Sequence, residues 1–376
     1  MDRIHPLLDR DKQGLAKQYE KEKRFLGLSG LILSVCVFMA FYFSGLSHAL
    51  SYLFLGENAI YAFFIYVIVL QTLLFLLGFP LRFYSEYVHE HIWDFSNQTQ
   101  KSWFWEQIKS YLVGLGLFVI LLGLLFLIME RYPHDWWWIA GLTMALVSTV
   151  FASLYPILIL PIFNTYTPVE DKELTDALDR ILSDGGLKSG GFLVEDMSRQ
   201  TKKENAFLAG LGRTRRVILG DNLIANMTVP EIVSIIAHEI GHYRHRHIWK
   251  HIVWGTLQQL VVFFFLNLVM KAAFPAFLSS TRANLTLFPF FAVLMGALSG
   301  FLFGPLSHAL SRHFETQADR YALKSIPHKS AFITALAGLA NRNLSNAYPS
   351  WWMKILYYSH PPIGERLRMA EKAESA

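Results

Sequence analysis

Cysteine is almost absent from this chain of 376 residues, and charged residues are sparse. The single cysteine, Cys36, excludes a disulfide bond within the chain and a zinc site built on cysteine thiolates. Any bound metal must therefore be held by histidine and carboxylate side chains. Only 17% of the residues are charged and 53% are hydrophobic, and the apolar residues are concentrated in long blocks. Blocks of this length indicate membrane spans.

The apolar blocks predict six transmembrane helices, near residues 25–47, 58–80, 108–130, 136–160, 251–274 and 286–309. Many polar and charged residues precede the first block and no small-residue cleavage site clearly follows it, so we expect an anchor and not a cleavable signal peptide. Lysine and arginine are frequent before the first block and absent from the loop after it, which predicts a cytosolic N-terminus. Alternating crossings then place residues 165–250 and the C-terminal tail on the cytosolic side.

The formal net charge of +5 does not indicate a nucleic-acid partner. The basic residues are distributed over loops next to the predicted spans, and no nucleic-acid recognition motif accompanies them. Membrane topology and contact with anionic lipid headgroups explain them better. We therefore expect membrane lipid, and no nucleic acid, around this protein.

The clearest candidate for a catalytic motif is the HExxH pattern formed by His238, Glu239 and His242. On a helix the two histidines project from one face, as ligands of Zn²⁺ do, and Glu239 can reach a water molecule on the metal. Thr228 and Glu231 have the spacing of a capping box, so we expect the pattern two turns inside a helix. This arrangement is typical of a zinc peptidase in which Glu239 is the general base.

A catalytic zinc also needs a third protein ligand and an open position for water. The best candidate is Glu315, with Asp319 one helical turn later. We expect Glu315 to bind the metal and Asp319 to accept the outer N–H of a ligand histidine. The alternative is a surface helix with an acidic pair. Two predicted crossings separate His242 from Glu315, and an even number of crossings returns the chain to the side it left, so the ligands can meet.

At these residues the sequence resembles the gluzincin metallopeptidases, in which HExxH is followed by ExxxD. More narrowly, it is similar over most of its length to the integral-membrane CaaX prenyl endopeptidases. Further stretches carry the resemblance: residues 156–164 with Pro168, Asn205-Ala206-Phe207 with residues 221–223, residues 359–362 with 365–367, and residues 86–88 with 95–99. The resemblance implies a large intramembrane chamber that receives the substrate.

Two further site assignments follow from the resemblance. Asn205, Ala206 and Phe207 are expected in a strand beside the zinc helix, where an extended peptide binds as an added strand. The alternative for these residues is an ordinary turn and strand. His360 and Arg366 are expected near the scissile carbonyl, as hydrogen-bond donors to the developing oxyanion. The alternative there is a His-Pro-Pro helix start with a surface arginine.

The chain is thus expected to be a mainly α, polytopic membrane protein with a small α+β gluzincin-like zinc peptidase domain at the cytosolic membrane surface. Residues 1–164 would form an N-terminal membrane domain with four transmembrane helices. Residues 165–376 would form the peptidase domain, including the spans near 251–274 and 286–309. Within it we expect an amphipathic helix around residues 174–182 and strands near 192–194 and 216–219. Most of the histidines in the stretch with His245, His247 and His251 are expected to face lipid headgroups, and the alternative is that they supply further metal ligands.

The predicted function is zinc-dependent hydrolysis of peptide bonds, with one Zn²⁺ per chain. The resemblance implies cleavage near the C-terminus of prenylated CaaX proteins. One alternative is a membrane quality-control protease of broad specificity. Another is a transporter or a non-catalytic scaffold with a structural metal, but three ligands do not close a structural zinc site and Glu239 would have no role there. The short length favours a bacterial inner membrane over the endoplasmic reticulum.

Overall fold

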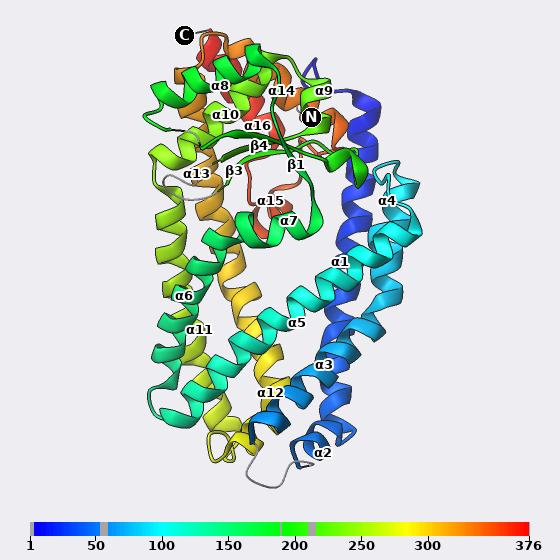
Figure 1. Cartoon of the computed structure of the whole chain (residues 1–376), viewed down its shortest axis with the longest axis vertical. Coiled ribbons are helices and arrows are strands. Elements are labelled where there is room, and N and C mark those ends of the chain that lie inside the picture. Colours follow the sequence, from blue (N-terminus) through cyan, green and yellow to red (C-terminus); the bar gives the residue numbers. More distant parts are fainter. Residues whose placement is uncertain (1–3, 53–58, 189, 210–215, 376) are drawn as a thin grey trace.

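The computed structural model describes residues 4–52, 59–188, 190–209 and 216–375. Long helices run along the longest axis of the molecule, and a small α+β unit covers one end of them (Figure 1). Both termini lie at that same end. The first residue of the span expected near residues 58–80 lies outside the described residues. The mainly α architecture that the sequence predicts is confirmed.

Within the described part of the chain, five helices are long and apolar enough to cross a membrane. They comprise α1 (Arg10–Phe43), α3 (Ala59–Arg82), α5 (Gln100–Arg131), α11 (His247–Ala273), and α12 (Thr281–Ala297), which continues through a π turn (Leu298–Phe303) into α13 (Gly304–Ser325). The span expected near residues 136–160 corresponds to the shorter α6 (Trp136–Leu154), followed by a π turn (Tyr155–Ile159) and α7 (Leu160–Phe163). Each expected span therefore has a helix. The remaining elements of this part are α2 (Leu46–Tyr52), a π turn (Phe83–Val88) and α4 (His89–Ile92).

The first helix begins much earlier than the apolar block near residues 25–47. The Asp9 side chain accepts hydrogen bonds from the backbone N–H groups of Asp11 and Lys12, which caps the helix at its polar start. The hydropathy of the block marks only the apolar part of α1, which is long enough to cross a membrane. The polar first turns instead pack against the α+β unit, where Gln13 and Ala16 are buried.

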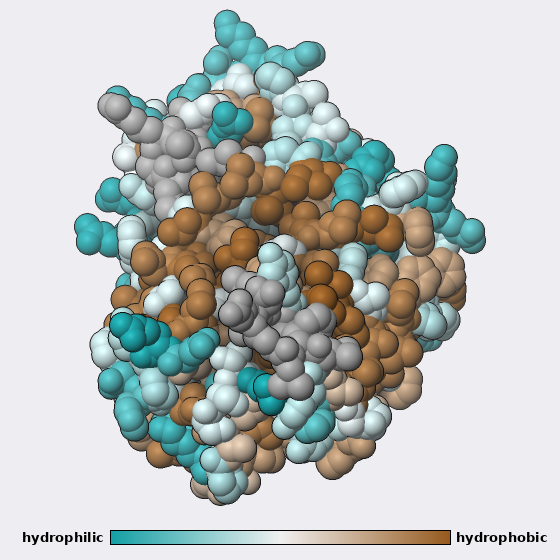
Figure 2. All heavy atoms as spheres, turned by 60° about the horizontal axis from the view of Figure 1, so that its bottom comes forward, coloured by the Kyte–Doolittle hydropathy of each residue, from teal (hydrophilic) through white to brown (hydrophobic). Residues whose placement is uncertain are grey.

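Large apolar side chains cover the outside of these helices. Leu76, Leu112, Leu127 and Leu146 are all more than half exposed. Figure 2 shows such side chains gathered over a broad area, with hydrophilic residues toward its margins. An apolar surface of this extent would be costly in water and is stable in a bilayer.

The membrane helices enclose a core of their own. α6 packs on α11, α1 packs on α3 and α12, and α5 crosses between these groups to contact both α3 and α6 (Figure 1). Trp136 is fully buried and its indole N–H donates to Asn267 Oδ1 at 2.9 Å. This bond satisfies a polar side chain that would be costly in contact with lipid.

The α+β unit contains a four-stranded sheet in the order β1-β2-β4-β3. The strands are β1 (Tyr166–Pro168), β2 (Phe192–Glu195), β3 (Ala206–Ala209) and β4 (Arg216–Gly220). β2 and β4 are parallel, and the outer pairs are antiparallel. The strands expected near residues 192–194 and 216–219 are confirmed as β2 and β4. β3 lies at one edge of the sheet, so one side of its backbone has no neighbouring strand among the described residues.

Helices pack around this sheet and form a second core. They are α8 (Lys172–Asp184), a short 3₁₀ turn (Met197–Arg199), α9 (Asp221–Asn226), α10 (Val229–Arg244), α14 (Lys329–Arg342) and α16 (Ile363–Glu374), whereas α15 (Trp351–Tyr357) packs on α13. α10 lies at the centre and contacts α8, α13 and α14. Its side chains Ile236, Ala237 and Ile240 are fully buried. At Gly241 an added Cβ would lie 2.8 Å from the Cα of Ala318 in α13. Glycine at this position therefore permits the close approach of the two helices that carry the candidate ligands.

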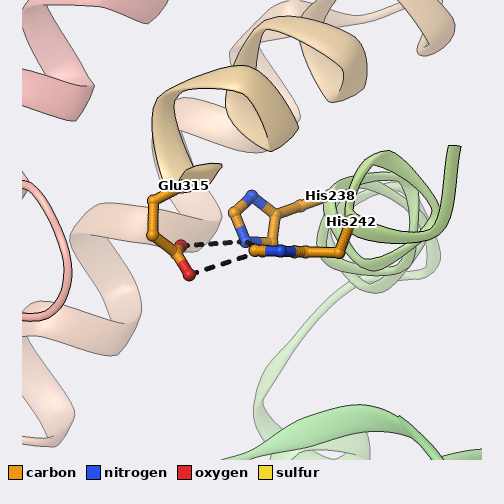
Figure 3. Close-up of side chains that lie close together, drawn as sticks. All are labelled: His238, His242 and Glu315. Carbon is orange, nitrogen blue, oxygen red and sulfur yellow. Dashed lines mark hydrogen bonds and ion pairs between the residues drawn. The ribbon is translucent and has the colours of Figure 1, made fainter. Parts of the chain in front are cut away.

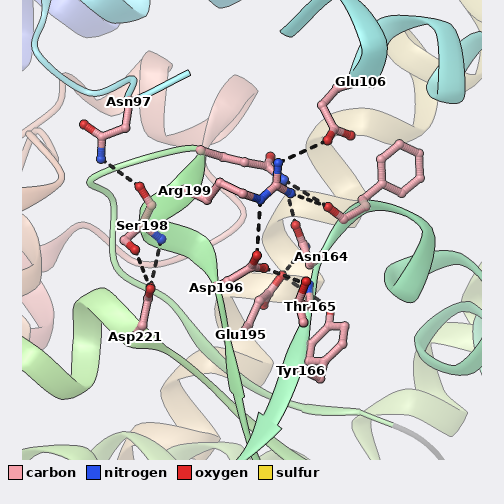
Figure 4. Close-up of polar contacts among 12 residues, drawn as sticks. Asn97, Glu106, Asn164, Thr165, Tyr166, Glu195, Asp196, Ser198, Arg199 and Asp221 are labelled. Carbon is pink, nitrogen blue, oxygen red and sulfur yellow. Dashed lines mark hydrogen bonds and ion pairs between the residues drawn. The ribbon is translucent and has the colours of Figure 1, made fainter. Parts of the chain in front are cut away.

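A polar network joins the sheet to the membrane helices (Figure 4). Arg199, which follows β2, donates to Asp196 at 3.2 Å, to Glu106 of α5 at 3.4 Å and to the Phe163 carbonyl of α7 at 2.6 Å. Asn97, in the loop before α5, donates to the Ser198 carbonyl at 2.8 Å. The connection that leads into β3 is thus held against the membrane helices, which fixes the position of the edge strand relative to them.

Candidate active site

The HExxH residues lie on α10, as the sequence predicts. Thr228 is the N-cap residue, and a capping box forms because the Glu231 side chain also accepts from the Thr228 backbone N–H at 2.8 Å. Two turns later His238 and His242 project toward α13. Their rings are 4.8 Å apart, and the two Nε2 atoms face each other at 3.1 Å.

Glu315 on α13 meets both histidines (Figure 3). Its Oε2 lies 3.2 Å from His238 Nε2, and its Oε1 lies 3.4 Å from His242 Nε2. The three residues come from two helices that are far apart in the sequence, and their ligand atoms all lie within 4.8 Å of one another. The structure therefore brings together the three residues that the sequence singled out as ligands.

These separations fit a single zinc ion. Ligand atoms at 2.0–2.1 Å from a tetrahedral zinc lie about 3.3 Å from each other. Glu315 Oε2 is buried and makes no hydrogen bond, which is costly for a carboxylate oxygen unless a cation satisfies it. Two imidazoles and one carboxylate also form a donor set that zinc prefers in catalytic sites. His238, His242 and Glu315 would hold the ion.

His238 is fixed from behind by charged groups. Its Nδ1 lies 2.7 Å from Asp319 Oδ1, and Arg366 donates to both oxygens of that carboxylate, at 2.8 Å and 2.6 Å. Burial alone would lower the pKa of His238, but the neighbouring carboxylates of Asp319 and Glu315 raise the pKa to about 9. Burial likewise disfavours the charged form of Arg366, yet the neighbouring Asp319 carboxylate raises its pKa. The Nδ1 contact is the geometry expected for Asp319.

His242 is fixed from behind by neutral groups. Its Nδ1 lies 3.0 Å from Nδ1 of His247, whose Nε2 is 2.9 Å from Oε1 of Gln317. The expectation that His247 faces lipid headgroups is wrong, since only 1% of this residue is exposed. Hydropathy and spacing gave no sign of this contact, because it depends on the turn at Arg246, whose φ is 55°.

Glu239 faces a cavity of about 620 Å³ on the open side of the ligands. Leu208 of β3, the ligand residues and His360 also line this cavity. Burial raises the pKa of the Glu239 carboxyl. A carboxylate next to the metal position, on the side open to a substrate, has the geometry of a general base.

The structure separates the two residues expected at the oxyanion. His360 lines the cavity, and its Nε2 lies 3.2 Å from Glu315 Oε1. Arg366 is 9% exposed and is not among the residues that line the cavity. Both of its contacts with Asp319 lie behind the ligand His238. The structure thus brings His360 to the open side of the site and Arg366 to the opposite side.

The residues expected in the substrate strand lie at the sheet edge. Ala206 and Phe207 begin β3, and the exposed Asn205 precedes it. The residue of β3 that lines the metal cavity is Leu208, which the sequence did not single out. Phe207, Leu208 and Ala209 together border a second cavity of about 610 Å³.

The second cavity lies between β3, α6 and α11. Its lining is mostly apolar and includes small residues of both helices, such as Ala145 and Gly255. The two cavities share Leu208, Ile248, Trp249 and His251. An apolar space of this size therefore adjoins the candidate metal site.

Comparison with known proteins agrees with this geometry. Residues 168–374 match the model of Peptidase family M48. Residues 2–165 match a family described as CAAX prenyl protease N-terminal, five membrane helices. The fold is similar to the crystal structure of S. mikatae Ste24p, with a TM-score of 0.84 and 24% identity, over 97% of this chain and 91% of that chain.

Curated relatives are similar over most of their length. CAAX prenyl protease 1 homolog of Oryza sativa is 30% identical, over 82% of this chain and 75% of the relative. CAAX prenyl protease 1 of Saccharomyces cerevisiae is 29% identical, over 80% and 70%. An uncharacterized metalloprotease, YhfN of Bacillus subtilis, is 28% identical, over 96% and 86%. The chain therefore belongs to peptidase family M48, as an integral-membrane metallopeptidase of the CaaX prenyl protease type.

Proposed function

We propose that this protein is a zinc endopeptidase that cleaves prenylated CaaX proteins near their C-terminus, with its active site on the cytosolic side of the membrane. The observation that carries the proposal is the junction at β3. There a strand edge, a three-ligand metal position and an apolar cavity meet at shared residues. The excess of lysine and arginine before the apolar part of α1 supports the orientation.

The residues of the site divide the chemistry among them. Zinc held by His238, His242 and Glu315 would supply the positive charge that acidifies water and polarises the scissile carbonyl. Glu239 takes a proton from the attacking water and returns it to the leaving amine. His360 donates a hydrogen bond to the oxyanion as the carbonyl carbon becomes tetrahedral.

The substrate is positioned on β3, which begins with Ala206 and Phe207 and is preceded by Asn205. An extended peptide that pairs with the free edge of β3 would pass Leu208, which lines the metal cavity. Backbone hydrogen bonds along such an edge supply affinity without requiring a particular side-chain sequence. This arrangement suits a protease that accepts many different sequences around the scissile bond.

The apolar cavity can hold the lipid of a lipidated substrate. A side chain that points from a peptide on β3 toward α6 and α11 would enter it, because Phe207, Leu208 and Ala209 form one of its walls. An isoprenoid chain buried there gains about 0.8 kcal/mol for each CH₂-sized group removed from water. The cavity thus favours a substrate whose residue at the cleavage point carries a long hydrocarbon chain.

Cleavage of a farnesylated peptide and of the same peptide without the lipid tests the proposal. We expect the wild-type protein to cleave the farnesylated peptide with a higher kcat/KM. Gly255→Leu should reduce this preference, because a Cβ at Gly255 meets open space on the cavity side of α11 and a leucine there fills the cavity. Gly296→Leu on α12 is the control, since Gly296 also has open space around its Cβ position but does not line the cavity.

Glu239→Gln separates catalysis from binding in the same assay. Loss of a general base typically lowers kcat by about 10²–10⁴-fold, while the zinc content should remain at one ion per chain. Full activity of this variant with zinc bound would contradict the role of Glu239. Equal rates on the two peptides would instead favour a protease of broad specificity.

A further inference from the structure

We infer that His247 is a positioning residue for the metal ligand His242, through a chain of hydrogen bonds that continues to Gln317 and His313. The inference rests on the metal site proposed above, because it assigns a role toward the bound ion to residues that do not touch it. His247 would set both the ring orientation of His242 and the nitrogen that carries its proton.

The position of His247 is built into the fold. α10 ends at Arg244 and α11 begins at His247, and Arg246 between them has φ 55° and ψ 38°. This left-handed residue turns the chain between the two helices, and His247 lies beside His242. The His247 ring is stacked on Phe314 with centroids 4.3 Å apart and planes 10° apart. It is therefore held in one orientation within the protein.

The order of protons along the chain follows from the metal position. His242 Nε2 faces Glu315 and His238, so it must present a lone pair there when the ion binds, and its proton is on Nδ1. His242 Nδ1–H then donates to His247 Nδ1 at 3.0 Å. His247 must carry its own proton on Nε2, which donates to Gln317 Oε1 at 2.9 Å.

In the last hydrogen bond of the chain, donation again runs away from the metal ligand. The amide of Gln317 donates through Nε2 to Nε2 of the exposed His313 at 3.0 Å. Every donor in the series faces one acceptor, so one tautomer of each imidazole satisfies the whole chain. A hydrogen bond to the outer nitrogen of a ligand histidine fixes its tautomer and raises its basicity. His247 supplies that bond for His242.

The test measures zinc affinity of the full chain in detergent, by competition with a chromogenic chelator. His247→Phe keeps a ring to stack on Phe314 and removes both nitrogens. We expect its zinc affinity to fall by about 10–100-fold, the range observed when such outer partners are removed. His245→Phe is the matched control: its ring is exposed and stacks beside His247, and it should leave the affinity unchanged.

A second pair of variants acts one link further away and leaves His247 in place. Gln317→Met removes the acceptor of the His247 Nε2–H, and Gln317→Glu keeps one. We expect the methionine variant to lose several-fold in zinc affinity and the glutamate variant to retain it. This difference would not arise if Gln317 only filled space, because both side chains are similar in size to glutamine.

A zinc affinity of His247→Phe within about twofold of wild type, or an equal loss in His245→Phe, would overturn the inference. If His247→Phe does not fold, equal zinc affinities of the two Gln317 variants would overturn it instead. Failure of the proposed function can be distinguished from failure of this inference, because the measurement of zinc affinity needs no substrate. A chain that binds zinc tightly and cleaves no peptide would refute the peptidase proposal and leave the role of His247 intact.

Discussion

The two sides of the metal site hold their ligand histidines by different means. Behind His238 stands a buried ion pair, in which Asp319 is fully buried and accepts two hydrogen bonds from Arg366. Behind His242 stands a neutral chain that begins with His247 and ends at the protein surface. The same task, fixing an imidazole, is therefore carried out once with full charges and once with neutral hydrogen bonds.

The difference has consequences for stability. Removing one partner of a buried ion pair leaves an uncompensated charge and typically costs about 3–5 kcal/mol. Removing one neutral hydrogen bond costs only about 1 kcal/mol. The Asp319 side thus contributes to the folding of the α+β unit as well as to metal binding, since it links α10, α13 and α16. The His247 side contributes mainly to the metal site.

The largest effect is expected from Asp319→Ala. This change removes the partner of His238 and leaves the Arg366 guanidinium buried without a carboxylate. We expect the free energy of unfolding of the zinc-free protein to fall by about 3–5 kcal/mol. Denaturant unfolding in detergent measures it. His247→Phe, measured in the same way, should lose no more than about 1 kcal/mol.

Arg366→Lys tests the same side without removing the charge. Lysine cannot form the two parallel hydrogen bonds that arginine makes with Asp319, so stability should fall while kcat at saturating zinc remains close to wild type. Equal losses of stability in Asp319→Ala and His247→Phe would remove the contrast between the two sides. A lower kcat in Arg366→Lys with stability unchanged would support the role at the oxyanion that the sequence predicted.

A smaller effect, on catalysis alone, is expected from His360→Gln. His360 belongs neither to the Asp319 side nor to the His247 side, because it approaches Glu315 from the cavity. Removing one donor to an oxyanion typically lowers kcat by about 10²–10³-fold, which corresponds to about 2.7–4 kcal/mol in the barrier. Zinc affinity and unfolding should change little. A loss of zinc in this variant comparable to that in His247→Phe would show that His360 positions the ligand Glu315.

The sequence was sufficient for the parts of the site that depend on helix geometry. The spacing of His238 and His242 and the capping box at Thr228 predicted the helix and the face that carries the ligands. Glu315 was chosen because Asp319 follows it one helical turn later, and the count of two membrane crossings showed that it could meet the histidines. Apolar blocks located the spans because lipid imposes a length on them, but the start of α1 at Arg10 had no such signal.

The parts that the sequence did not predict depend on contacts between distant elements. His247 reaches His242 through a single left-handed residue, which no periodic pattern reveals. β1 has only three residues and ends at Pro168, so it had no strand pattern to detect. Arg366 was expected at the substrate side, yet it lies behind His238 because α16 packs against α13 and α14. The residues that share a helix face can be predicted from their spacing in the sequence. Which other element that face packs against can be determined only from the folded structure.

The smallest effect is expected at the other end of the helix that carries both histidines. Thr228→Ala removes the side chain of the capping box, two turns before His238, and should lower the free energy of unfolding by about 1 kcal/mol. Zinc affinity measured by chelator competition should remain within about twofold of wild type, because the capping box contacts neither Asp319 nor His247. The stability loss would match that of His247→Phe while the zinc affinities differ. If Thr228→Ala lowered zinc affinity as much as His247→Phe, any small loss of helix stability would explain both results, and the contact between His247 and His242 would have no separate role.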